Sequence, residues 1–119
     1  MLVKRFEDLD CWQAAREMTR FVYSLARQPA FRRDRRLVEQ ITAASVSAMN
    51  NIAEGFDTRS KPESRRFYDY ARRTCSEVQS CLYVALDCGY IADAEFRTAY
   101  ELAQTTRKLT SGWSRSVGE

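Results

Sequence analysis

Two acidic residues, Glu54 and Glu77, interrupt regions that otherwise follow an apolar helical pattern. Each belongs to a set of residues spaced three or four apart, so each set lies on one face of a helix. The first set comprises Gln40, Ala44, Ser47, Asn51 and Glu54, and the second comprises Tyr70, Thr74, Glu77, Cys81, Val84 and Cys88. We expect the polar members to face one another in a polar seam beside the core, made of Gln40, Ser47, Asn51, Glu54, Thr74 and Glu77.

The polar seam is open to three interpretations. It can be a satisfied polar layer that fixes the register of the helices, as buried polar residues do in coiled coils. It can be a carboxylate pair for acid–base or metal chemistry, although no His and no ExxH spacing accompanies Glu54 and Glu77. It can also be a partner-binding surface. Because an unpaired carboxylate is costly to bury, Glu77 must lie at the surface or accept a hydrogen bond.

The residues that usually carry catalysis or bind metals are scarce. The chain has no His, which removes the commonest general base and metal ligand. Its four Cys form no CxxC motif and are typical of small buried apolar groups in a reducing compartment. We therefore predict a protein that is not an enzyme and holds no metal or cofactor. No apolar signal core or membrane-spanning run is present, so we expect a cytoplasmic protein that does not contact membranes.

Arginine dominates the basic residues and gathers in three clusters. The formal net charge is only +3, but of the 19 Lys and Arg residues all except Lys4, Lys61 and Lys108 are Arg. The clusters are Arg32, Arg33, Arg35 and Arg36; Arg59, Lys61, Arg65 and Arg66; and Arg72 and Arg73. Cations at a helix start oppose the macrodipole, so an anionic partner such as nucleic acid would explain them.

The three arginine clusters are also compatible with causes that involve no anionic partner. A GC-rich genome, a solvated helix face or salt bridges between subunits would each place arginines there. Acidic neighbours, Asp34, Glu63 and Asp69, dilute each cluster. No aromatic platform for single-stranded nucleic acid is evident between the basic residues.

Helical periodicity runs through four segments, and no segment has the alternation of a strand. We predict helices over residues 9–27, 33–54, 61–88 and 94–111, all within one domain of residues 1–119. Pro29 ends the first helix, and Gly55 and Gly89 stop the second and third. Short connections make neighbouring helices antiparallel, so the predicted fold is an all-α, up-down-up-down four-helix bundle.

Local signals also predict how the helices start and which residues they bury. Asp8 or Asp10 is expected to cap the first helix, and Asp93 the fourth. Ser60 and Glu63 form a capping box with Pro62 in the first turn of the third helix. The apolar stripe of that helix is expected to comprise Phe67, Ala71, Cys75, Val78, Leu82 and Ala85.

Several of these residues carry a resemblance to a known family over about residues 6–110. They are Phe6, Leu9, Trp12, Gln13, Ala15, Gln40, Ser47, the run from Asn51 to Gly55, Arg59, Ser60, Phe67, Ala71 and Glu77. The chain resembles the bacterial four-helix-bundle family labelled 23S rRNA intervening sequence protein. Some members of that family are encoded in insertions within large-subunit rRNA genes, so the label describes a genomic location and not an activity.

The resemblance implies a four-helix bundle without assigned catalytic activity that forms ring-like homo-oligomers, pentamers in particular. A related protein is the accessory variability protein of diversity-generating retroelements, a basic pentamer that associates with reverse transcriptase and nucleic acid. The resemblance makes Asn51, Glu54 and Glu77 signature structural positions. Ala43 stands where the family commonly has Arg, and Arg73-Thr74 where it commonly has Gly-Ser, so a charged surface is relocated.

The function predicted from the sequence is a non-enzymatic, homo-oligomeric scaffold or accessory protein. It would bind RNA, DNA or a nucleoprotein such as a reverse transcriptase through its Arg-rich surfaces. The alternative is a protein–protein interaction module with no nucleic-acid role, which would use exposed aromatic residues such as Trp12, Tyr23 or Trp113.

Overall fold

A computed structural model describes residues 2–118, and these residues form helices joined by short connections. A single 3-10 turn, η1 (Phe6–Asp8), precedes the first long helix, α1 (Asp10–Ala26). A short helix, α2 (Pro29–Arg33), leads into α3 (Arg35–Asp57). The chain continues through α4 (Lys61–Asp87) and α5 (Asp93–Gly118). No strand occurs in this part of the chain, so the predicted all-α class is confirmed.

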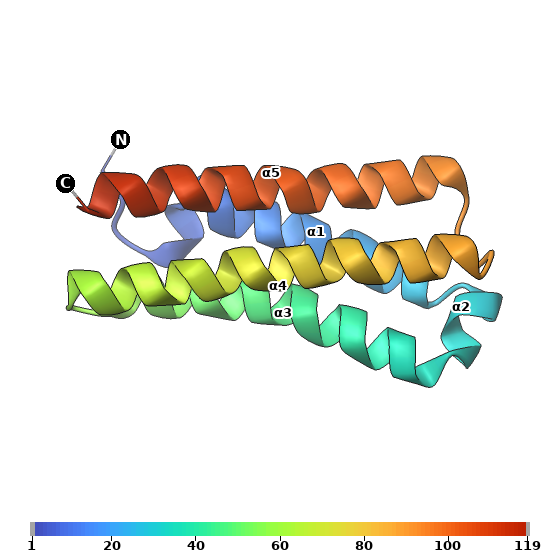
Figure 1. Cartoon of the computed structure of the whole chain (residues 1–119). Coiled ribbons are helices and arrows are strands. Elements are labelled where there is room, and N and C mark those ends of the chain that lie inside the picture. The colour runs from blue at the N-terminus through green and yellow to red at the C-terminus, as the bar shows by residue number, and fades with distance from the viewer. Residues whose placement is uncertain (1, 119) are drawn as a thin grey trace.

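The four long helices lie side by side in an elongated bundle of 45 × 23 × 18 Å (Figure 1). α4 packs between α3 and α5, and α1 contacts both α3 and α5, which closes the bundle. The two chain ends lie at the same end of the bundle as the α3–α4 connection, and α2 lies at the opposite end. None of the helices within residues 2–118 is long and apolar enough to cross a membrane.

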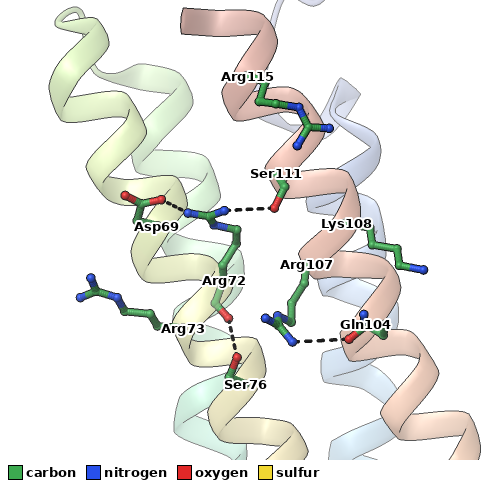
Figure 2. Close-up of a pocket in the computed structure, with 9 residues that line it drawn as sticks. All are labelled: Asp69, Arg72, Arg73, Ser76, Gln104, Arg107, Lys108, Ser111 and Arg115. Carbon is green, nitrogen blue, oxygen red and sulfur yellow. Dashed lines mark hydrogen bonds and ion pairs between the residues drawn. The ribbon is translucent and has the colours of Figure 1, made fainter.

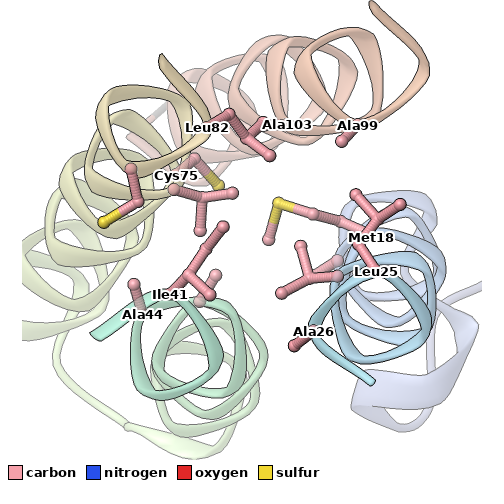
Figure 3. Close-up of a cluster of buried hydrophobic side chains, with 14 of the residues drawn as sticks. Met18, Leu25, Ala26, Ile41, Ala44, Cys75, Leu82, Ala99 and Ala103 are labelled. Carbon is pink, nitrogen blue, oxygen red and sulfur yellow. The ribbon is translucent and has the colours of Figure 1, made fainter. Parts of the chain in front are cut away.

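The core runs along the bundle axis and receives side chains from every long helix. Met18 and Leu25 from α1 meet Ile41 from α3 and Leu82 from α4, while α5 adds only alanines at this level (Figure 3). Small residues on α5 let its backbone approach closely. Its buried polar residues, Thr106 and Thr110, donate to carbonyls one turn earlier, so neither hydroxyl is left unsatisfied.

Both ends of α4 follow the sequence signals. The Ser60 hydroxyl accepts a hydrogen bond from the Glu63 amide at 3.4 Å, and Pro62 lies in the first turn. Gly89 adopts a φ of +75°, which suits a residue without a side chain. The amides of Gly89 and Tyr90 then donate to carbonyls of the last turn, at Leu86 and Ala85.

Gly55 does not end its helix, so the predicted end at residue 54 is wrong. α3 continues to Asp57, and Thr58 closes it by donating from both its amide and its hydroxyl to the Glu54 carbonyl. Gly55 is instead a point of close approach: a Cβ atom there would lie 2.6 Å from the Tyr68 ring. Tyr68, and not the predicted Phe67, is the aromatic side chain that α4 buries, at 1% exposed.

The second predicted helix begins at Arg35 and not at residue 33, and a short helix that was not predicted, α2, precedes it. Asp34 breaks the helix between α2 and α3, because its carboxylate accepts from the Leu37 amide at 3.1 Å and caps α3. The same carboxylate accepts from the Tyr90 hydroxyl at 3.0 Å. This hydrogen bond raises the pKa of Tyr90 and ties the α4–α5 turn to the start of α3.

The predicted caps of the first and fourth helices are also wrong. Leu9 occupies the cap position of α1, and neither Asp8 nor Asp10 makes a capping hydrogen bond. At the start of α5, Asp93 is the first helical residue and not the cap, and the Glu95 carboxylate accepts from the Ala92 amide at 2.8 Å. Glu95 also accepts a hydrogen bond from the Gln28 side chain at 2.7 Å. The predicted end of this helix at residue 111 is wrong as well, because α5 continues for seven more residues.

Candidate functional site

A basic groove of about 670 Å³ lies between α4 and α5. Figure 2 shows the side chains of the two helices around it. Nine residues line this α4–α5 groove: Asp69, Arg72, Arg73, Ser76, Gln104, Arg107, Lys108, Ser111 and Arg115. Five of the nine are cations and one is a carboxylate, so the groove carries a local excess of positive charge.

Helical spacing explains why these side chains meet. Asp69, Arg72 and Ser76 follow one another at spacings of three and four on α4, so they form a row along one face. Gln104, Arg107, Ser111 and Arg115 do the same on α5. Arg73 and Lys108 point outward from the two helices and form the rims of the groove (Figure 2).

Arg72 links the two walls of the groove. Its guanidinium pairs with Asp69 on the same helix, and its Nη1 donates to the Ser111 hydroxyl of α5 at 3.2 Å. Its Nε atom is buried and has no partner within the described residues. The pairing holds the guanidinium across the groove, and exposed fractions of 40% for Arg72 and 47% for Asp69 leave the ion pair open to solvent.

Arg107 is held by two glutamine side chains. Its Nη1 donates to Gln79 Oε1 at 3.2 Å and to Gln104 Oε1 at 3.5 Å, and its Nε is buried without a partner among the described residues. Gln79 is itself only 5% exposed. Its amide nitrogen donates to Gln104 Oε1 at 3.1 Å, so one glutamine bridge fixes the position of the cation.

No carboxylate within residues 2–118 forms an ion pair with Arg107. The positive charge of Arg107 influences a buried thiol in the core. Burial raises the pKa of the nearby Cys75 thiol to about 12, and the charge of Arg107 acts in the opposite direction. Burial likewise raises the pKa of Cys11 to about 11. These two thiols stay protonated near neutral pH and behave as apolar core groups, whereas Cys88 is exposed.

The structure brings only Arg72 and Arg73 of the predicted basic residues into the groove. Arg65 is exposed one turn before Asp69 on α4 and extends the same face toward the end of the bundle. The rest of the predicted set is exposed elsewhere: Arg59, Lys61 and Arg66 near the α3–α4 connection, and Arg32, Arg33, Arg35 and Arg36 around α2. The α2 cluster therefore lies at the opposite end of the bundle (Figure 1).

Arg107, Lys108 and Arg115 of α5 are groove cations that were not predicted from the sequence. The sequence contains the signal, because Gln104, Arg107, Ser111 and Arg115 repeat at spacings of three and four. Helical periodicity alone does not identify the neighbouring helix that this row faces. Only the packing of α4 against α5 combines the two rows into one groove.

The polar seam is not part of the core. Gln40, Glu54 and Glu77 are exposed, and Ser47, Asn51 and Thr74 are half-buried. Asn51 donates to the Ser47 carbonyl at 2.8 Å and to its hydroxyl at 3.0 Å, a contact within α3. Water solvates the exposed Glu77 carboxylate, which therefore needs no protein partner. The expected hydrogen bonds between the seam residues of α3 and those of α4 are absent from the described residues.

The charged side chains of the groove suit an anion better than a metal ion. Arg and Lys repel cations, and Asp69, the only carboxylate in the lining, already pairs with Arg72. Within residues 2–118, no three His, Cys, Asp or Glu side chains gather as a metal site would require. The groove instead offers guanidinium and hydroxyl donors, the groups that recognise phosphate oxygens.

A family model described as 23S rRNA-intervening sequence protein matches residues 7–112. The chain belongs to this family. The match confirms the resemblance seen in the sequence and reaches all four long helices. In this member of the 23S rRNA-intervening sequence protein family, the matched region includes every groove residue except Arg115. A comparison with curated proteins finds no match.

Proposed function

We propose that the protein is a non-enzymatic accessory protein that binds nucleic acid through the α4–α5 groove. The observation that carries this proposal is the local charge: five cations and one paired carboxylate line a groove of about 670 Å³. A formal net charge of +3 for the whole chain means that this face holds a disproportionate share of the positive charge. Phosphodiesters are the polyanions that such an Arg-rich surface fits best.

The chemistry of the groove supports binding rather than catalysis. Its side chains are guanidinium, ammonium, hydroxyl and amide groups, and Asp69 is engaged by Arg72. These groups hold and orient phosphates but supply no free general base. We therefore propose an accessory role, in which the protein positions a nucleic acid or a nucleoprotein.

Salt dependence provides the first test. Binding of a labelled oligonucleotide would be measured by fluorescence anisotropy at several salt concentrations. If all five groove cations each contact one phosphate of a single strand, the logarithm of the binding constant should fall with the logarithm of salt concentration at a slope of roughly −3.5. Absence of binding at about 50 mM salt would contradict the proposal.

Charge removal provides the second test and locates the surface. The double variant Lys108→Gln, Arg115→Gln removes two groove cations and should make the salt slope shallower by roughly 1.4. The variant Arg32→Gln, Arg33→Gln removes the same charge from the opposite end of the bundle and should leave the slope unchanged. Equal losses in both variants would show that net charge, and not the groove, determines binding.

We further propose that the protein forms a homo-oligomer, with a pentamer as the form that the family resemblance favours. Tyr70, Glu77 and Val84 recur every seven residues on α4 and form one exposed stripe, here called the α4 stripe. Tyr70 is 46% exposed and Val84 is 45% exposed, so both side chains are accessible to a second chain. A partner surface on the α4 stripe would also place Glu77 within reach of a second chain.

Light scattering on the isolated protein tests this second proposal and the alternative function. A mass equal to a multiple of one chain, without nucleic-acid binding, would favour a protein–protein interaction module. A single-chain mass at micromolar concentration would contradict the oligomer.

A further inference from the structure

An aromatic cluster lies along the same two helices as the α4–α5 groove. Tyr83 of α4 packs against Phe96 and Tyr100 of α5, with ring centroids 4.9 Å and 6.0 Å away. Phe96 and Tyr100 are 5.6 Å apart, so the three rings support one another. Tyr83 nevertheless remains 51% exposed, the most exposed aromatic side chain among those described. The cluster therefore presents a ring that is held in place and open on one side.

Gln79 connects the aromatic cluster to the basic groove. Its Oε1 accepts from the Arg107 guanidinium at 3.2 Å, and its Nε2 lies 3.4 Å from the Tyr100 carbonyl. Tyr83 follows Gln79 by one turn on the same side of α4. The open ring therefore lies about two helical turns, roughly 10 Å, from the position of Ser76 in the groove lining. The exposed Tyr83 ring and the basic groove thus lie along the same face of α4.

The excess of positive charge on this face ends at the rings. Asp87 follows Tyr83 by one turn on α4, and Asp93 begins α5 one turn before Arg97, so charges of both signs lie there. Phosphates are favoured beside Arg72 and Arg107, where cations predominate. The two ends of this face therefore differ: one end suits the phosphate backbone of a nucleic acid, and the other offers an apolar ring.

Single-stranded and double-stranded nucleic acids use such a face differently. A duplex offers phosphates to the groove, but the faces of its bases are stacked inside the helix. A single strand offers the same phosphates and also unpaired bases, which stack on exposed aromatic rings without regard to sequence. Basic grooves next to aromatic platforms are how proteins bind single strands.

We infer that the α4–α5 face binds single-stranded nucleic acid, with phosphates in the basic groove and an unpaired base stacked on Tyr83. The inference rests on the proposed nucleic-acid function and specifies the class of nucleic acid. It also assigns Tyr83 a role in preferring single strands over duplexes. Arg72 and Arg107 hold the backbone of the strand.

The test compares Tyr83→Ala with Tyr23→Ala, which removes another exposed tyrosine, 38% exposed, from α1. Anisotropy would be measured with a single strand of about 12 nucleotides and with its duplex, at fixed salt. Tyr83→Ala should weaken single-strand binding by about 10-fold and leave duplex binding unchanged. Tyr83→Phe, which keeps the ring, and Tyr23→Ala should both bind like the wild-type protein.

The possible failures are distinguishable. If the wild-type protein binds neither nucleic acid, the proposed function falls and this inference falls with it. If it binds both but Tyr83→Ala has no effect, or weakens both equally, only the inference is overturned. A change of oligomeric mass in Tyr83→Ala with unchanged binding would make the cluster a subunit contact and would also overturn it. Should Tyr83→Ala fail to fold, Tyr83→Trp keeps the test decisive: single strands, and not duplexes, should quench the added fluorescence.

Discussion

At the scale of single residues, Gly55 and Tyr68 show how one missing side chain shapes the bundle. Tyr68 is 1% exposed. A Cβ atom on Gly55 would lie only 2.6 Å from the Cε1 atom of the Tyr68 ring. Near the same point, the Ser64 hydroxyl donates to the Gly55 carbonyl at 2.7 Å. The glycine therefore serves the packing of α3 against α4 and not the end of a helix.

Gly55→Ala should destabilise the protein by about 1–2 kcal/mol, because the buried Tyr68 ring cannot move away from the new methyl group without strain. Urea unfolding would measure the change. Gly112→Ala is the matched control, since the nearest atom to its Cβ is the end of the Arg115 side chain at 3.9 Å. That variant should gain about 0.5–1 kcal/mol from helix propensity. A stabilised Gly55→Ala protein would contradict the packing argument.

At the scale of elements, α5 depends on contacts at both of its ends. Its start is fixed by Glu95, which accepts from the Ala92 amide and from Gln28 next to α2. Near its other end, the Trp113 indole donates to the Tyr68 hydroxyl of α4 at 2.8 Å. These contacts hold the helix that supplies one wall of the groove, so they position Arg107 and Arg115 indirectly.

Glu95 should make the free energy of unfolding decrease as the pH is lowered into the acidic range. The Ala92 amide and then Gln28 lower the pKa of Glu95 below its ordinary value of 4.5. Because the folded-state pKa is the lower one, the stabilisation is complete above 4.5 and is lost as pH falls through the folded-state pKa. An NMR titration should show Glu95 ionised below pH 4.5, and Gln28→Ala should raise its pKa. An unchanged pKa in that variant would contradict the role of Gln28.

Trp113→Phe should cost about 1–3 kcal/mol, because it leaves the buried Tyr68 hydroxyl without its donor. Trp12→Phe is the control: Trp12 is also half-buried, but its indole donates to no group among the described residues. Urea unfolding of the two variants should therefore differ. In a Tyr68→Phe background, Trp113→Phe should lower the free energy of unfolding by less, because no buried hydroxyl is left without a hydrogen-bond donor. Equal costs in both backgrounds would argue against this hydrogen bond.

At the scale of the whole molecule, the proposed nucleic-acid surface and the proposed subunit contact lie on different sides of α4. Asp69, Arg72, Ser76 and Tyr83 lie toward α5, while Thr74 and the α4 stripe lie away from it. One helix can therefore contribute to both surfaces, and the two surfaces meet where the Arg73 guanidinium lies 5.7 Å from the centroid of the Tyr70 ring.

Val84→Glu should convert the proposed oligomer to single chains, because a carboxylate would be buried without a partner in the interface. Light scattering at several protein concentrations would show the loss of mass. Tyr23→Glu places the same charge on an exposed residue of α1 and should leave the mass unchanged. If Val84→Glu keeps the wild-type mass, the α4 stripe is not the contact.

The class of the fold, the number of long helices and the family were all predictable from the sequence. Apolar spacing, Ser60 and Gly89 are local signals, and their physical causes act within one or two turns. The ends of α3 and α5 were predicted wrongly because contacts between helices decide them. Gly55 resembles a helix-terminating glycine in the sequence, but in the structure it makes room for Tyr68. α5 continues beyond its apolar pattern because Trp113 donates a hydrogen bond to Tyr68 of α4.

The candidate site depended on the tertiary structure to a greater degree. The sequence identified Arg72 and Arg73 but not the row on α5, because periodicity gives the face of a helix and not its neighbour. It also grouped Glu54 and Glu77 near a core from which both are absent. Only the packing of α4 against α5 decides which charges combine, and only that packing places Tyr83 beside the groove.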